Sequence, residues 1–558
     1  ISDISLLRRN IFLVSAAAFI LAVLLAVSFA RRFFRPVRAL AGAMKEVQEG
    51  RLDIRVDVYS EDEIGYLTNT FNHMVIRIKK LIEDNYLIRL REKDAQIEAL
   101  QLQINPHFLY NTLESITTAN VLFDFTHFFD IIKGGGFMMT YTAYDPETLE
   151  QWCSDKTNFQ LFDSALQDYL QIFSDQFHAK SQKKYFSTLI KGFFSPLDRK
   201  SLEPIALQFL GEDSVRSLQQ FYSRSPLPDQ QLMDTYQQRL SSMLDTPNGM
   251  LSVDECGFPK KGTHSVGVKR QYCGCLGKTE NCQVGVFLAY AGDNGYGLVD
   301  RELYIPQEWF GPSYDGLRKE CRLPPEKTFA TKNQIALDML NRALDSGLLH
   351  AQWIGCDAAY GNDHAFLDGL HLPEQVWYFA ATNCKELVFL EQPQECIPPG
   401  SGGRRRKHPP LSPSPVRVES IAQDPEIPWE WVTLAEGSKG PIQAQKKQIR
   451  CVSCRADRNR NYVEPGPEIW LYLRKYEDGR IKYFVSNAPG EIEPEELDRA
   501  ATLRWPIEQS FEECKSYLGM GHYECRSYTG WKRHMQFVMI AHLFTTQIKA
   551  LVKKRGSF

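Results

Sequence analysis

The strongest constraint on the fold is a run of twenty residues without a charge, Ile11–Ala30, near the start of the chain. About twenty apolar residues is the length that an α-helix needs to cross the hydrocarbon core of a membrane. More basic residues follow the run than precede it: Arg8 and Arg9 come before it, and Arg31, Arg32, Arg35 and Arg38 come after it. This asymmetry predicts one transmembrane segment in residues 1–35, with everything after residue 30 in the cytoplasm. A signal peptide is the alternative, although no cleavage site of small residues follows the run.

The rest of the chain has the composition of packed globular domains. Of its 558 residues, 43% are hydrophobic and 24% are charged, which excludes a long disordered protein. The formal net charge of −3 excludes a uniformly basic body, so a nucleic acid would have to be held by local basic patches. Thirteen scattered cysteines favour reduced thiols in a cytosol over a framework of disulfides. Because the first residue is Ile1 and not Met, we expect a fragment or one piece of an interrupted reading frame.

Residues 36–88 have the pattern of two short amphipathic helices joined by a connector. Pro36 begins the first helix, and the segment 62–65 opens the second, in which Phe71 and Met74 are expected on one face. The region resembles a HAMP signalling module. The residues that carry this resemblance are Pro36, Leu40, Glu63, Gly65, Phe71, Asn72 and Met74.

Residues 89–120 continue as a predicted coiled coil that leads into a short motif. Apolar residues recur seven apart, the repeat of a parallel dimeric coiled coil, at Leu90, Ile97 and Ile104. The string NPHFLYN follows at Asn105–Asn111 and resembles the phosphoacceptor box of bacterial sensor histidine kinases, with His107 as the phosphoacceptor. Nothing after residue 120 resembles an ATP-binding domain. We therefore expect a truncated kinase in which His107 is vestigial and kinase activity is absent.

Residues 121–138 continue the pattern of neither neighbour and are interpreted as a junction. The codons for Lys133–Gly135 can form a ribosome-binding sequence just upstream of Met138 and Met139. We hypothesise that a mobile element landed in a sensor-kinase gene and that Met138 or Met139 starts a separate protein. A true linker between evolved domains is the alternative.

From residue 139 to residue 248, apolar residues recur at helical spacing, as at Leu166, Leu170 and Phe173. Basic residues, Lys200 among them, recur along the same stretch. The pattern predicts a helical N-terminal DNA-binding domain. Lysines that only solubilise exposed helix faces are the alternative.

Asp254 and Asp357 each follow an apolar segment that predicts a β-strand. Between them the pattern predicts strands at 283–291 and 297–305 and an amphipathic helix at 331–349. Three strands, a helix and a fourth strand are the layout of an RNase-H-like α/β domain, in which neighbouring strand ends bring the two aspartates together. Carboxylates so placed repel each other unless cations neutralise them, so the pair is a candidate divalent-metal site.

A third acid, Glu508, lies far along the chain between two basic residues. Arg504, Glu508 and Lys515 are separated by three and by six residues, so on one helix all three would share a face. Such a helix suits a site in which Glu508 ligates a metal while Arg504 and Lys515 hold phosphates.

These five residues and their spacing resemble the DDE transposases of bacterial insertion sequences, especially the insertion sequence 701 group, over about residues 139–558. The resemblance implies an RNase-H-like DDE catalytic domain at residues 249–558. It also implies that Asp254, Asp357 and Glu508 are catalytic and hold two Mg²⁺ ions, which Mn²⁺ can replace.

The resemblance further implies a β-rich insertion at about residues 385–490. A Gly- and Pro-rich loop near its start carries a basic cluster, for which a disordered tether is the alternative reading. The expected DNA-binding residues are Arg504, Lys515, Arg526, Arg404, Arg405, Arg406 and Lys407. The tyrosine that often stands three residues before the signature arginine is replaced by Ala501, which puts that tyrosine's contact in doubt.

The leading interpretation is a DNA transposase that performs metal-dependent cleavage and strand transfer of an insertion sequence, fused to a sensor-kinase remnant. Its expected partners are the terminal inverted repeats, target DNA and a second copy in a homodimer. The alternative is a membrane signalling subunit whose His107 is phosphorylated by a partner and serves a response regulator, with an inactive transposase as passenger. The full chain is expected in the inner (cytoplasmic) membrane through residues 11–30, and a chain started at Met138 or Met139 in the cytoplasm.

Overall fold

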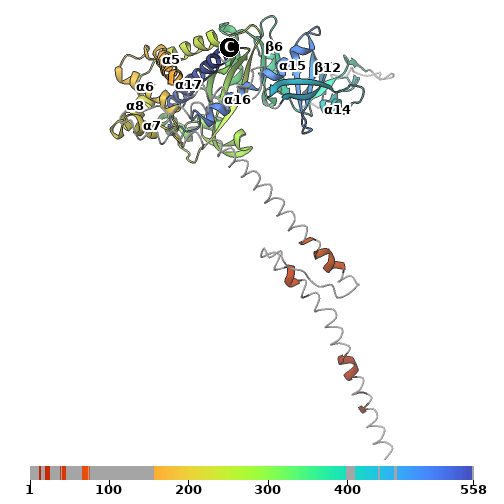
Figure 1. Cartoon of the computed structure of the whole chain (residues 1–558). Helices are drawn as coiled ribbons and strands as arrows, with labels where there is room; N and C mark the ends of the chain where they lie inside the picture. The colour runs from red at the N-terminus through yellow and green to blue at the C-terminus, as the bar shows by residue number, and fades with distance from the viewer. Residues whose placement is uncertain are drawn as a thin grey trace, which may run out of the picture. The chain divides into compact units, whose positions relative to one another are not determined.

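The computed structural model describes residues 156–396, 409–437, 440–457 and 462–555, together with short helical stretches between residues 12 and 75. The chain divides into two compact units, residues 1–121 and residues 122–558 (Figure 1). All strands among the described residues belong to the second unit.

In the first unit, the helix at residues 66–75 confirms the predicted second amphipathic stretch. Thr68, Phe71, Asn72 and Val75 are each at most 8% exposed and follow i, i+3, i+4, i+7 spacing. Met74, one turn beyond Phe71, is 48% exposed, so of the two residues predicted on one face only Phe71 is buried. At about 100° per residue, Met74 lies roughly 110° around the helix from the centre of the buried stripe. The other motif positions of this unit lie outside the described residues: Pro36, Leu40, Glu63, Gly65, Leu90, Ile97, Ile104 and His107.

No helix within the described ranges has both the length and the apolar character needed to cross a membrane. Of the predicted span Ile11–Ala30, only residues 12–13, 15 and 19–24 are described, and they are helical. The junction at 121–138 is likewise outside the described residues.

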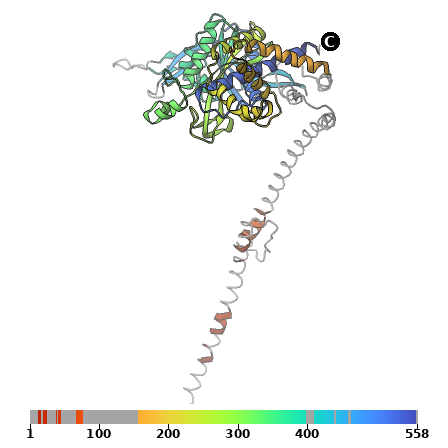
Figure 2. The same ribbon diagram turned by 90° about the vertical axis from the view of Figure 1, so that its left-hand side faces the viewer.

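The described N-terminal part of the second unit is helical, as predicted. Its helices are α5 (Lys156–Ser174), α6 (Lys180–Phe193), α7 (Leu202–Phe209), α8 (Val215–Ser223) and α9 (Asp229–Leu244). α6, α8 and α9 pack on α17 (Tyr528–Arg555), and α5 lies beside α17 in Figures 1 and 2. The hydroxyl of Tyr169 donates to the carbonyl of Ile540 at 2.8 Å, and the rings of Phe186 and Phe537 lie 5.5 Å apart. These helices and the central sheet therefore share one hydrophobic core.

The middle of the sheet has the strand order that the sequence predicts. β1 (Gly249–Pro259), β3 (Lys278–Gly292) and β4 (Gly295–Tyr304) are antiparallel neighbours. After α11 (Lys332–Ser346), β5 (Ala351–Cys356) lies parallel to β1 on its other side, and β6 (Trp377–Thr382) lies parallel to β5. The remaining elements here are β2 (Lys269–Cys273), α10 (Asp315–Glu320), α12 (Ala358–Gly361) and α13 (His364–Asp368).

One detail of the prediction is wrong: β1 does not end at Asp254. The strand continues to Pro259, paired with β3 alone. Its pairing with β5 stops at Val253, which lies opposite Cys356. Asp254 is therefore the first residue of β1 that has no neighbour in β5.

The predicted β-rich insertion is present and continues the same sheet. Its elements are β7 (Leu387–Phe389), β8 (Gln394–Glu395), β9 (Leu411–Ser412), β10 (Val416–Arg417), α14 (Val418–Gln423), β11 (Glu430–Gly437), β12 (Gly440–Asp457), β13 (Tyr462–Lys475) and β14 (Ile481–Ser486). β14 pairs with β6, which joins the insertion to the central strands. The chain turns from β13 into β14 at Asp478–Gly479, where Gly479 has a φ of +81°, a left-handed conformation that favours glycine.

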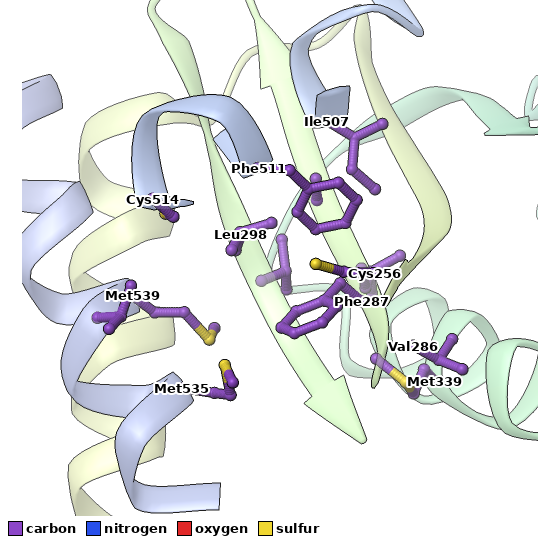
Figure 3. Packing of buried hydrophobic residues seen from close by; sticks show 14 of the residues in the cluster. Cys256, Val286, Phe287, Leu298, Met339, Ile507, Phe511, Cys514, Met535 and Met539 are labelled. Atoms are coloured by element: carbon purple, nitrogen blue, oxygen red, sulfur yellow. The ribbon is translucent and has the colours of Figure 1, made fainter. Parts of the chain in front are cut away.

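Two helices return the chain from the insertion to the middle of the sheet. They are α15 (Pro494–Leu503) and α16 (Pro506–Ser516). α16 buries Ile507, Phe511 and Cys514 among side chains of the central strands and of α17 (Figure 3). The ring of Phe511 lies 5.3 Å from that of Phe287 on β3. This apolar packing fixes how α16 lies on the sheet, and so fixes where its charged residues are placed.

Candidate active site

Asp254 and Asp357 are neighbours because β1 and β5 are parallel and in register. Val253 lies opposite Cys356, and the next residue on each segment is an aspartate. Both aspartates are partly exposed. Asp357 also caps α12, where its carboxylate accepts the backbone N–H of Ala359 at 2.9 Å. The two carboxylates are thus held at the edge where β5 ends.

The charges of the other two predicted acids act on Asp254. The pKa of Asp254 is raised to about 7, first by burial, then by the charge of Asp357, with a smaller contribution from Glu508. Arg504 and the backbone N–H of Glu255, 2.7 Å from the Asp254 carboxylate, act in the opposite direction. Burial also raises the pKa of Asp357. Negative charge is therefore under-compensated at this edge of the sheet, as expected where a cation binds.

Arg504, Glu508 and Lys515 do not share one helix, which corrects the prediction. Pro506 has no N–H to continue the helical hydrogen bonds, so α15 ends before Arg504 and α16 begins at Pro506. Arg504 and Trp505 keep right-handed helical angles, and Arg504 Nη2 still lies 2.6 Å from Glu508 Oε1. Glu508 and Lys515 are both on α16, seven residues apart and on one face.

Sequence analysis missed two small residues, Gly355 and Ser252, that lie opposite each other on β5 and β1. Arg504 is 8% exposed and packs over Gly355 of β5. A Cβ added at Gly355 would lie 3.4 Å from Arg504 Cγ and 2.6 Å from the Oγ of Ser252. Gly355 and Ser252 each stand two residues before an aspartate, on the same side of the sheet. That spacing is the only signal in the sequence that marks them.

Lys515 reaches the same strand from α16. Its ammonium charge acts on the thiol of Cys256, two residues after Asp254. Burial raises the pKa of that thiol to about 12, in spite of the nearby ammonium group. Glu255, which lies between Asp254 and Cys256 in the sequence, forms an ion pair with Lys332 at 2.6 Å. The sequence alone does not reveal this partner. Lys515 therefore places a positive charge beside the acids.

The opposite side of α16 carries a second carboxylate, Glu513, which is fully buried. It accepts hydrogen bonds from Tyr296 at 2.5 Å and contacts His542 at 2.8 Å and Lys549 at 2.9 Å. Burial alone would raise the pKa of Glu513, but Lys549, His542 and Tyr296 outweigh it and hold that pKa well below its usual range. This network ties α16 to β4 and α17, and it fixes the helix that carries Glu508.

A metal site is not assembled in the conformation described. Within residues 156–396, 409–437, 440–457 and 462–555, no three His, Cys, Asp or Glu side chains converge closely enough to hold an ion. At the candidate site, Glu508 contacts Arg504 instead of the two aspartates. The donor set still fits a hard divalent cation, because it consists of carboxylate oxygens on adjacent strands and a facing helix.

The other predicted site residues are placed as follows. Arg526 is exposed just before α17, and its carbonyl accepts the backbone N–H of Val266 at 2.9 Å. Ala501 is buried in α15 within a cluster that includes Leu497 and Trp353, which leaves no open space for a tyrosine ring. The basic loop residues Arg404, Arg405, Arg406 and Lys407 lie outside the described residues, as does His107.

Comparison with known families assigns both parts of the chain. Residues 172–441 match the DDE superfamily endonuclease family, a range that contains Asp254 and Asp357 and ends before Glu508. Residues 28–80 match the HAMP domain, and residues 95–127 match the histidine kinase family. The chain therefore joins a DDE superfamily endonuclease region to a preceding HAMP and histidine kinase region, as the sequence predicted.

Individual relatives agree with this division. Over 85 residues the chain is 45% identical to the sensor histidine kinase YesM of Bacillus subtilis (strain 168), which is 14% of this chain and 15% of that protein. Over 211 residues it is 29% identical to the "Probable transposase for insertion sequence element IS701" of Microchaete diplosiphon, which is 37% of this chain and 51% of that protein. The chain thus spans about half of the transposase and a small part of the kinase.

A solved structure adds no further support. The cryo-EM structure of the piggyBac transposase synaptic complex with hairpin DNA aligns over 75% of this chain and 77% of that chain. The TM-score is 0.32 and the identity is 9%, a likeness too weak to carry an argument.

Proposed function

We propose that the second unit is a metal-dependent DNA transposase that cleaves the ends of an insertion sequence and joins them to target DNA. The observation that carries this proposal is the register of β1 and β5, which puts Asp254 and Asp357 side by side within a DDE superfamily endonuclease region. Glu508 lies close enough to raise the pKa of Asp254. The proposal makes these three acids the catalytic residues.

The residues fit a pair of Mg²⁺ ions, with Mn²⁺ as a substitute. Asp254, Asp357 and Glu508 would hold the ions, with Glu508 leaving Arg504 to do so. When bound, the cations supply the activation of water for cleavage and of the new 3′-hydroxyl for strand transfer.

The residues around the acids provide the hold on DNA. Arg504 and Lys515 flank Glu508 with positive charge, so they are suited to bind the phosphates on either side of the scissile bond. Arg526 and the loop residues Arg404–Lys407 remain predicted contacts to the DNA backbone. The bound DNA would be the terminal inverted repeats and then the target, engaged by a homodimer.

The test is strand cleavage by the purified full chain on duplexes that carry the DNA flanking its reading frame. We expect cleavage with Mg²⁺ or Mn²⁺, none with a chelator, and none for Glu508→Gln with Mg²⁺. Glu508→Gln keeps the length of the side chain and removes one ligating charge, so its DNA binding should persist. Cleavage that continues in the chelator would overturn the proposal.

A second candidate function is favoured by the 45% identity of the front part to a sensor histidine kinase. In that case the chain is a membrane signalling subunit whose His107 receives a phosphoryl group from a partner's ATP-binding domain and passes it to a response regulator. We expect no label on His107 when the purified chain is incubated with radioactive ATP alone. Label transferred by an intact kinase of the same class, together with absent DNA cleavage, would favour this second function.

The cellular location depends on whether the cell makes the full chain or a shorter chain that starts at Met138 or Met139. The described helical residues between 12 and 24 expose Phe12, Leu13, Phe19 and Ile20, which supports attachment of the full chain to the inner membrane. A chain started at Met138 or Met139 would be cytoplasmic. Fractionation of cells followed by mass spectrometry of N-terminal peptides separates the two, and finding only the membrane-bound full chain would exclude the internal start.

A further inference from the structure

Lys200 connects the ends of two helices that lie far apart in the sequence. It stands in the segment between α6 and α7 and is 3% exposed. Its Nζ donates to the carbonyl of Phe193, the last residue of α6, at 2.8 Å. The same Nζ donates to the carbonyl of Tyr517, which caps the C-terminus of α16. One ammonium group therefore serves the ends of both helices.

The chemistry of these two acceptors explains why a lysine occupies this position. The last carbonyls of a helix have no partner within the helix, and they carry the negative end of its dipole. A cation with several N–H donors satisfies both needs at once. Burial lowers the pKa of Lys200 to about 7, which shows that removing its amino group from water is unfavourable. The hydrogen bonds to the two carbonyls offset this desolvation free energy.

The turn that follows α16 is shaped around Lys200. Gly519 has a φ of +68°, and a Cβ added there would lie 2.7 Å from Lys200 Cβ. The backbone N–H of Lys200 also donates to His522 Nδ1 at 3.0 Å. The carbonyl of Gly519 in turn contacts His534 Nε2 at 3.1 Å, and His534 Nδ1 lies 2.6 Å from the hydroxyl of Tyr222 on α8. The turn is thus held by residues of the helical region and of α17.

The same burial argues against a role for Lys200 in holding DNA. Sequence analysis counted it among the basic residues of a DNA-binding domain, but a side chain this buried presents no free charge to a phosphate. Its donors point at backbone carbonyls instead. Lys200 acts on the structure of the protein, not on a ligand.

We propose that Lys200 is a positioning residue that fixes the C-terminal end of α16 to the helical region, and so sets the register of Glu508 and Lys515 over the two aspartates. Lys515 lies two residues before the Tyr517 carbonyl, and Glu508 lies about 14 Å back along the helix at 1.5 Å per residue. The Glu513 network holds the middle of α16 and Lys200 holds its end, so the two contacts together fix both its position and its rotation. This inference rests on the proposed function, because the register matters only if Glu508 is catalytic.

The experiment compares the unsubstituted full chain with Lys200→Met and Lys200→Arg. Met keeps most of the apolar stem and removes the donors, whereas Arg keeps a cation with donors. Two readouts are taken: hydrogen exchange of the amides at 514–522, and cleavage kinetics on the flanking-DNA duplexes with Mg²⁺. For Lys200→Met we expect at least tenfold faster exchange in that turn, and a kcat at least tenfold lower with KM unchanged within twofold. For Lys200→Arg we expect at least a third of the original kcat.

Lys319→Met is the matched control, since Lys319 is an exposed lysine in the last turn of α10. It should change neither readout. Lys200→Met with normal exchange and normal kcat would overturn the proposal, as would a loss in Lys200→Arg as large as that in Lys200→Met. If Lys200→Met does not fold, Lys200→Arg decides: near-normal kcat supports the proposal, and a folded protein with lost kcat overturns it. If the unsubstituted chain does not cleave DNA, the proposed function fails, while the exchange data still show whether Lys200 holds the end of α16.

Discussion

Glu508 and Glu513 lie five residues apart on the same helix, yet their surroundings assign them opposite roles. Glu508 is partly exposed, has one cationic partner in Arg504, and lies near Asp254, whose pKa it helps to raise. Glu513 is fully buried and meets four partners, Gln509, Tyr296, His542 and Lys549. A carboxylate with all its partners in place stabilises the fold, whereas a group of acids with too few partners has capacity left to bind a cation.

The comparison also shows what separates the three acids of α16 in the structure. Glu508, Glu512 and Glu513 all follow the break at Pro506, and each is a glutamate on α16. Only their rotation about the helix axis separates them. That rotation is fixed by the apolar face of α16 and by the contacts of Glu513 and Lys200.

The largest expected effect is the loss of one of the two strand-end aspartates. Asp254→Ala or Asp357→Ala should lower cleavage by about 10³-fold or more, because the site loses charge that would stabilise the reaction. DNA binding should survive, since carboxylates repel phosphates. Cleavage and gel-shift assays with the same duplexes measure both. If either variant cuts at a near-normal rate, the substituted aspartate is not a catalytic residue.

The other carboxylate of the comparison should behave in the opposite way. Glu513→Gln leaves the buried His542 and the partly buried Lys549 beside a neutral amide, and breaking a buried network in this manner costs about 3 kcal/mol or more of stability. Thermal unfolding of the full chain should show a lower midpoint for the second unit. Once folded at low temperature, the variant should bind DNA as the unsubstituted chain does. Unchanged unfolding would mean that the Glu513 network does not anchor α16.

The pH dependence of that stability difference follows from the sign of the pKa shift. The folded-state pKa of Glu513 lies below its ordinary value of 4.5, so its ionised form is favoured by folding. Its contribution is fully present above about pH 4.5 and is lost as the pH falls further, towards the folded-state pKa. The difference in unfolding midpoint between Glu513→Gln and the unsubstituted chain should therefore shrink as the pH falls below about 4.5. A difference that grows on acidification would contradict the assignment.

A smaller effect should distinguish the roles of Arg504 and Lys515, the two cations beside Glu508. Sequence reasoning assigns one phosphate to each of Arg504 and Lys515, but Arg504 is buried against Gly355 and paired with Glu508. Lys515→Ala should flatten the salt dependence of DNA binding by about one unit of slope. Arg504→Ala should change that slope less and lower cleavage more, by about 10²-fold. If both variants flatten the salt dependence of DNA binding equally, Arg504 binds a phosphate in the same way as Lys515.

Much of this site could be predicted from the sequence because strand periodicity and spacing are local signals. Asp254 and Asp357 follow apolar runs, and the parallel pairing of those runs follows from the helix between them. The partners of Glu513 and Lys200 could not be predicted, because Tyr296, His542 and Phe193 are brought to them only by long-range packing. Pro506 marks the helix break before α16 in the sequence, whereas the spacing of Arg504, Glu508 and Lys515 predicts one continuous helix.

The smallest expected effect concerns Glu512, the glutamate next to Glu513 and one turn beyond Glu508. Glu512 is exposed and lies about 40° around the helix from Glu508, so by position alone it is the residue best placed to replace Glu508 as a ligand. In the structure, however, Arg504 contacts Glu508, and the charge of Glu508 is among those that raise the pKa of Asp254. Glu512→Gln should therefore change cleavage by no more than about twofold, as for other exposed positions.

The sharper test of Glu512 is the double variant. Glu508→Ala and Glu508→Ala with Glu512→Gln should cut equally slowly, because a carboxylate that does not reach the aspartates cannot rescue the site. If the double variant is at least tenfold slower than Glu508→Ala, then Glu512 supplies the residual activity. In that case the Glu512 side chain can reach the two aspartates, and the rotation of α16 does not restrict catalysis to Glu508.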